Sequence, residues 1–100
     1  MAPMVTSEEI IQSLKRFKTM MGQEYQIRRI GLFGSAARGR INPQSDIDVV
    51  VELERQDLFA LIGIKQDLED QLHRQVDVVS YRERMNHFLK TRIEKEAIYV

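Results

Sequence analysis

The eight residues from Asp46 to Leu53 carry the strongest structural signal in the chain. They read Asp-Ile-Asp-Val-Val-Val-Glu-Leu, and such β-branched residues favour extended strands. Further strands are predicted at residues 26–33, 76–79 and 97–100, and helices at about 6–22, 57–74 and 82–95. Because strands and helices alternate, we expect helices to cover a mixed β-sheet of about four strands, an α/β or α+β layer fold.

The expected helices each have an apolar face. In the first, Thr6 and Glu9 form a capping-box pattern, and Gly22 marks the end. Its apolar residues recur at helical spacing: Ile10, Leu14, Phe17 and Met21. The buried stripe predicted for residues 57–74 is Leu58, Leu61, Ile62, Leu68 and Leu72. The face predicted for residues 82–95 is Met85, Phe88, Leu89 and Ile93.

The length and composition indicate one cytoplasmic domain over residues 1–100. The chain has no cysteine, which excludes disulfides and cysteine metal sites. Fifteen Lys and Arg balance fifteen Asp and Glu, so we expect no strong binding to duplex DNA, which usually needs a basic excess. No apolar run approaches the roughly 20 residues of a membrane span. The first nine residues do not resemble a secretory signal, and Asn42-Pro43 is a turn signal.

Asp46 and Asp48 are the first candidate site residues. On a strand, residues i and i+2 point to the same face, roughly 6 to 7 Å apart at Cα. Two carboxylates so close repel each other, and one would have its pKa raised unless a cation lay between them. Oxygen ligands favour Mg²⁺. A Ca²⁺-binding loop is excluded because Val49-Val50-Val51 follows as a strand.

Asp77 is the third candidate ligand. It is the only charged residue in Val76-Asp77-Val78-Val79, where an unpaired carboxylate would be costly. If this strand lies beside the strand of Asp48, Asp77 completes a three-carboxylate cluster. Taken alone, Asp77 is better explained as a strand cap or a partner of Arg74 or Arg82.

Gly34, Ser35 and Arg38 form a candidate phosphate site at the end of the strand 26–33. The small residues 34–39 are expected to make a tight turn that opens a short helix, whose N-terminal end would favour an anion. A glycine there lets backbone N–H groups approach a phosphate, Ser35 adds a hydroxyl, and Arg38 a fork of donors. Gly-Ser by itself is more often a plain turn. A P-loop is excluded because Gly-Lys-Ser/Thr is missing.

The spacing of these motifs resembles a known superfamily. Gly34-Ser35, ten intervening residues and Asp46-Ile47-Asp48 match the Gly-Ser-x10-Asp-x-Asp pattern of the DNA polymerase β-like nucleotidyltransferases. The segments Gly34–Gly39 and Ser45–Val51 are similar to the minimal nucleotidyltransferase (MNT) branch, known chiefly as the antitoxin of HEPN–MNT toxin–antitoxin pairs. Asp77 also follows at a distance similar to that branch. The resemblance extends to the C-terminal Glu96–Val100 and implies the polymerase β-like fold.

The resemblance implies a magnesium-dependent transfer of AMP from ATP to a tyrosine of a partner HEPN-type toxin, which silences its RNase activity. Asp46, Asp48 and Asp77 would then hold two Mg²⁺ ions. Gly34 and Ser35 would hold the β/γ-phosphates with help from Arg38. Two alternatives stay open: an antitoxin that neutralises its toxin by binding alone, and transfer to a small molecule or an RNA end. Base selectivity and oligomeric state are not determined by the sequence.

Overall fold

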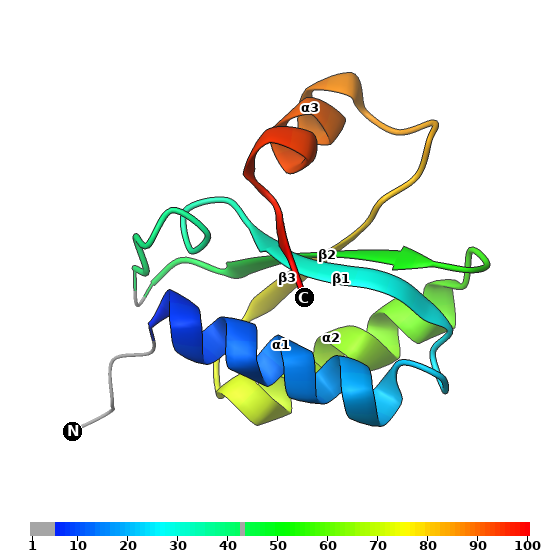
Figure 1. Cartoon of the computed structure of the whole chain (residues 1–100), viewed down its shortest axis with the longest axis horizontal. Coiled ribbons are helices and arrows are strands. Elements are labelled where there is room, and N and C mark those ends of the chain that lie inside the picture. The colour runs from blue at the N-terminus through cyan, green and yellow to red at the C-terminus, as the bar shows by residue number, and fades with distance from the viewer. Residues whose placement is uncertain (1–5, 43) are drawn as a thin grey trace.

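The computed structural model describes residues 6–42 and 44–100 and has the expected α+β architecture (Figure 1). Its elements are α1 Ser7–Met21, β1 Ile27–Phe33, β2 Ile47–Leu53, α2 Leu58–Leu72, β3 Val76–Ser80, α3 His87–Glu96 and β4 Ile98–Tyr99. No described helix is long and apolar enough to span a bilayer. The expectations that rested on residues 1–5 and on Pro43 lie outside the described residues.

The strands form one mixed sheet in the order β3-β2-β1-β4. Strand β1 is antiparallel to both β2 and β4, whereas β2 and β3 are parallel. A parallel pair needs a long crossover, which α2 provides. This arrangement places Asp48 in the middle of three strands, opposite Phe33 of β1 on one side and opposite Asp77 of β3 on the other.

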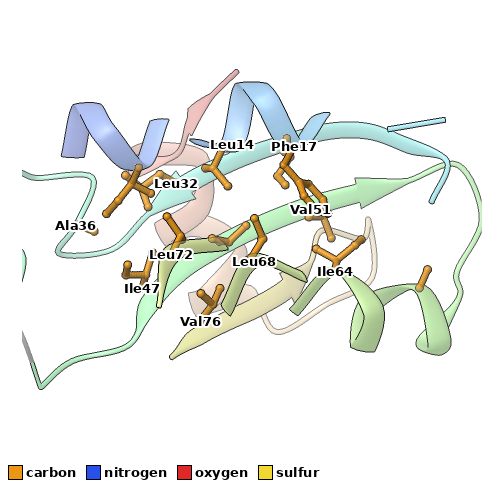
Figure 2. Packing of buried hydrophobic residues seen from close by; sticks show 14 of the residues in the cluster. Leu14, Phe17, Leu32, Ala36, Ile47, Val51, Ile64, Leu68, Leu72 and Val76 are labelled. Atoms are coloured by element: carbon orange, nitrogen blue, oxygen red, sulfur yellow. The ribbon is translucent and has the colours of Figure 1, made fainter. Parts of the chain in front are cut away.

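The sheet has a hydrophobic core on each face. On one face, α1 and α2 pack against alternate strand residues, among them Leu32, Val51 and Val76 (Figure 2). On the other face, Phe33, Val50 and Ile93 form a smaller core beneath α3, the helix on the opposite side of the sheet in Figure 1. Because side chains alternate along a strand, a strand residue next to one that packs under α1 and α2 points to the other face, toward α3.

The capping prediction for the first helix is confirmed. The Thr6 side chain accepts a hydrogen bond from the backbone N–H of Glu9 at 3.1 Å, which satisfies one of the free donors at the helix start. Ile10, Leu14 and Phe17 are buried as predicted. The helix therefore presents the apolar face that the sequence indicated, and Gly22 caps its C-terminal end.

The prediction of a short helix after Gly34 is wrong. Residues 34–39 make successive turns, in which the Ser35 carbonyl accepts from the N–H groups of Arg38 and Arg40 at 3.1 and 2.9 Å. Gly34 and Gly39 both have left-handed backbones, with φ of 76° and 81°. The second left-handed residue turns the chain away before a helix can propagate. No helix dipole therefore contributes to the candidate phosphate site.

The buried stripe predicted for α2 is wrong in part. The helix buries Ala60, Ile64, Leu68 and Leu72, whereas Leu58 and Ile62 are exposed. The helix is thus rotated so that small Ala60 lies against the sheet, which permits close packing. In α3, which begins only at His87 after the Asn86 cap, Phe88 is likewise 80% exposed rather than buried.

We predict that Tyr25→Phe lowers the free energy of unfolding by about 1 kcal/mol, the usual contribution of one hydrogen bond. The Tyr25 hydroxyl donates to Oδ2 of Asp67 at 2.7 Å. This bond, followed by burial, raises the pKa of Tyr25 to about 12. Because the folded pKa exceeds the unfolded value of about 10, the stabilisation is present below pH 10 and lost as the pH rises toward 12.

Urea denaturation at pH 8 and at strongly alkaline pH measures this effect. The matched control is Tyr81→Phe, because the Tyr81 hydroxyl makes no hydrogen bond within the part of the chain that the structure describes. Equal stability changes in the two variants would contradict the assignment.

Candidate active site

Asp48 and Asp77 lie side by side on the α3 face of the sheet. They are direct neighbours in the parallel register of β2 and β3. Their chain neighbours Ile47, Val49 and Val76 point into the opposite core, so strand alternation turns both carboxylates toward α3. Asp46 precedes the first residue of β2 and is exposed. The expectation that the strand of Asp77 lies beside that of Asp48 is confirmed.

Asp48 is the electrostatic centre of this group. Burial raises its pKa above the ordinary value, and the negative charges of Asp77, Asp46 and Glu96 raise it further, whereas Arg92 acts in the opposite direction. Uncompensated repulsion among carboxylates is what a divalent cation relieves. Within residues 6–42 and 44–100, however, no three acidic or histidine side chains lie close enough to hold a metal ion as they stand.

The alternative partners of Asp77 are not used. Among the described residues, Asp77 forms no ion pair with Arg74 or Arg82. Arg74 instead donates to the backbone carbonyls of Asn42 and Ser45, the latter at 2.9 Å. It therefore ties down the loop that leads into Asp46, a role that sequence reasoning missed because nothing in the local pattern links positions so far apart.

Gly34 brings the turn against the carboxylate of Asp48. It directly follows Phe33, which is the register partner of Asp48, and its backbone is left-handed. A Cβ added at this position would collide with Oδ2 of Asp48. Only glycine permits this approach together with this backbone, so the structure brings the predicted Gly-Ser pair and the acidic pair to the same place.

The turn that carries Gly34 and Ser35 is anchored by the larger core and by the start of α1. Ala36 is buried in the larger core, and the hydroxyl of Ser7, at the start of α1, donates to its carbonyl oxygen. Ser35 is half-buried, and its hydroxyl makes no hydrogen bond within the described part of the chain. Sequence reasoning missed Ser7, because Ser7 and Ala36 lie 29 positions apart.

Arg38 does not stand free at the site. Its Nη1 donates to Oε1 of Glu96, the last residue of α3, at 2.6 Å. Arg92 on the same helix lies 3.9 Å from the other oxygen of Glu96. Sequence reasoning missed Glu96 and Arg92, because only the tertiary placement of α3 over this face brings them near Asp48.

Comparisons with known proteins show the family and the fold of the chain. A family model described as a nucleotidyltransferase domain matches residues 14–100. The protein adenylyltransferase MntA of Thermococcus cleftensis is 34% identical over 98 residues, which cover 97% of this chain and 98% of the relative. A solved structure of a candidate minimal nucleotidyltransferase is 28% identical, with a TM-score of 0.78 over 97% of this chain and 98% of that one.

A more distant solved structure shares the fold alone. It is the MNT antitoxin of Shewanella oneidensis in complex with a tri-AMPylated HEPN toxin, and it is 20% identical with a TM-score of 0.66. The alignment covers 93% of this chain and 70% of that one.

Proposed function

This chain belongs to the nucleotidyltransferase domain family, and we propose that it transfers AMP from ATP to a tyrosine hydroxyl of a HEPN-type toxin, for which it is the antitoxin. The observation that carries the proposal is the position of Asp48, which has Asp77 beside it in the sheet and Gly34 against its carboxylate. The acceptor class follows from the family resemblance and from the protein adenylyltransferase MntA. We place the reaction in the cytoplasm, where ATP is available.

The reaction is an in-line displacement at the α-phosphate of ATP. A bond forms between the acceptor oxygen and the α-phosphorus, the bond from that phosphorus to the bridging oxygen breaks, and pyrophosphate leaves with the electron pair. The acceptor hydroxyl gives its proton to solvent water. The protein contributes mainly by positioning and by charge stabilisation. Gly34 and Ser35 would hold the β/γ-phosphates, because a turn of this kind can direct backbone N–H groups at an anion and the half-buried Ser35 hydroxyl has no hydrogen-bond partner in the described residues.

The donor chemistry of three acidic residues suits Mg²⁺, although within the described residues no three such side chains are close enough to hold an ion as they stand. Asp48 and Asp77 are oxygen donors whose mutual repulsion raises the pKa of Asp48, and Asp46 adds a third carboxylate at the start of the strand. These three residues would hold the ions. When bound, Mg²⁺ neutralises the triphosphate and lowers the pKa of the attacking hydroxyl.

The proposal predicts that label moves to the partner from ATP labelled at the α-phosphate and not from ATP labelled at the γ-phosphate. The chain is mixed with its HEPN-type partner, ATP and Mg²⁺, and the partner is analysed by intact-mass spectrometry. We expect the partner's mass to increase by whole AMP units and its RNase activity to fall. Replacement of its acceptor tyrosine with phenylalanine should abolish the adduct.

The same experiment separates the competing functions. Inhibition of the partner without an adduct, in ATP and Mg²⁺, would identify an antitoxin that acts by binding alone. Label on RNA ends or on a small molecule, with none on protein, would identify a different acceptor. Either result would contradict the proposed transfer to a protein.

A further inference from the structure

Glu96 lies between two arginines, Arg92 on its own helix and Arg38 on a distant part of the chain. Its Oε1 accepts from Arg38, which lies 58 positions earlier on the turn of Gly34. Its Oε2 lies 3.9 Å from Nε of Arg92, one turn earlier on α3. One carboxylate therefore joins the turn and the helix across the α3 face of the sheet.

The stability of the fold does not explain this arrangement. Oε2 of Glu96 is buried and has no hydrogen-bond partner among the described residues, and such an oxygen costs free energy. The ion pair with Arg38 adds little stability, because the Arg38 side chain is 49% exposed and exposed ion pairs contribute weakly to the free energy of folding. A buried oxygen without a hydrogen-bond partner calls for an explanation, and here the explanation is the candidate active site beside it.

The pair of Glu96 and Arg38 adjoins the candidate site. Arg38 lies four residues after Gly34 on the turn that comes against the carboxylate of Asp48, and Glu96 holds it there at 2.6 Å. Arg38 also keeps binding capacity. A guanidinium has five N–H donors, and in the described residues only Nη1 of Arg38 is engaged, by Glu96.

We propose that Glu96 is a positioning residue for nucleotide binding, which holds the guanidinium of Arg38 beside the Gly34–Ser35 turn so that its remaining donors meet the β/γ-phosphates. This inference rests on the proposed function and names a further residue of the same site. Without Glu96, the exposed Arg38 side chain is free to sample many rotamers, and binding a phosphate must then supply the cost of ordering it. Because Glu96 touches no reacting atom, its loss should affect nucleotide affinity more than turnover.

The test is Glu96→Gln, which keeps the shape of the side chain and removes the charge. Affinity is measured by calorimetry with Mg²⁺ and an ATP analogue that has a methylene bridge between the α- and β-phosphates, alongside KM and kcat for ATP. We expect Kd and KM to rise about tenfold, the scale of a lost charge-assisted hydrogen bond, with a much smaller change in kcat. Unchanged or tighter binding would overturn the inference.

Two controls assign the effect to Arg38. Glu94→Gln removes the same charge from an exposed position of the same helix and should leave Kd unchanged. Because Glu96 acts through Arg38, adding Glu96→Gln to Arg38→Ala should weaken binding no further than Arg38→Ala alone. Equal effects of Glu96→Gln in both backgrounds would refute this route.

Should Glu96→Gln fail to fold, Arg38→Lys provides the second test. Lysine still pairs with Glu96 but lacks the planar fork, so we expect weaker analogue binding at an unchanged melting temperature, and wild-type affinity would overturn the inference. The proposed function fails separately: a wild-type protein that binds the analogue but transfers no label contradicts the reaction and not the positioning. A wild-type protein that transfers label, with a Glu96→Gln variant of normal Kd, contradicts only the positioning.

Discussion

Asp48→Asn is expected to lower AMP transfer by at least about 10³-fold, the scale of losing a central catalytic group, while making the folded protein more stable. Asp48 joins the two halves of the site, with Asp77 beside it in the register of β2 and β3 and Gly34 against its carboxylate. An amide cannot replace a carboxylate in binding a hard divalent cation or in stabilising the charge of the transition state. The loss should therefore appear in kcat.

The stability gain follows from the pKa of Asp48, which burial and the neighbouring acids raise. A raised pKa means that the folded state favours the protonated carboxyl. Between the unfolded and the folded pKa the native state binds more protons, so stability falls as the pH rises through that window. Above the folded pKa the loss is complete, and an asparagine, which does not ionise, avoids it.

Chemical denaturation at pH 4 and pH 7 without divalent cations, together with the label-transfer assay, measures both effects. The variant should exceed the wild-type stability by more at pH 7 than at pH 4. Asp70→Asn is the matched control, because Asp70 is an exposed residue of α2, the helix on the opposite side of the sheet (Figure 1). A variant that retains transfer, or one that loses stability at pH 7, would contradict the central position of Asp48.

Gly34→Ala is expected to destabilise the protein by roughly 3 kcal/mol and to reduce transfer by about 10²-fold. The left-handed backbone at Gly34 costs an alanine roughly 1–2 kcal/mol. The added methyl group also collides with the Asp48 carboxylate, and such overpacking costs roughly 1–3 kcal/mol. Because the displaced group is catalytic, a shift of about 1 Å is enough for the loss of rate.

Gly39→Ala is the control that distinguishes backbone strain from the collision with Asp48. Gly39 has nearly the same left-handed φ, but a Cβ there meets nothing within 4 Å. We expect this variant to lose only the roughly 1–2 kcal/mol of backbone strain, with a far smaller effect on transfer per folded molecule. Denaturation curves and kcat/KM for both variants provide the comparison. Similar losses of activity in the two variants would show that contact with Asp48 is not what matters at Gly34.

Much of the secondary structure could be predicted because its signals are local. The spacing of Ile10, Leu14 and Phe17 and the cap at Thr6 depend on neighbours within a few residues, and both are confirmed. The same holds for the β-branched run from Ile47 to Leu53. Local signals failed where packing decides. The exposure of Leu58 and Phe88 depends on which face of each helix meets the sheet.

The residues from 34 to 39 show a similar limit. Their small side chains are compatible with a helix or with turns, and the left-handed Gly34 and Gly39 decide for turns. The buried Ala36 and its hydrogen bond from Ser7 then hold the turn in place. These contacts join segments that are distant along the chain, so the local pattern does not reveal them.

By itself, the sequence predicted the strand of Asp48 and identified Asp77 as the charged residue of an apolar strand, because strand propensity is local; that Asp46 shares a face with Asp48 stays a prediction, since Asp46 precedes β2. Only the tertiary structure decided that β2 and β3 are parallel, with Asp48 opposite Asp77. It also placed Gly34 against Asp48 and Glu96 beside Arg38. Strand register and helix placement follow from long-range packing, which no short stretch of sequence encodes.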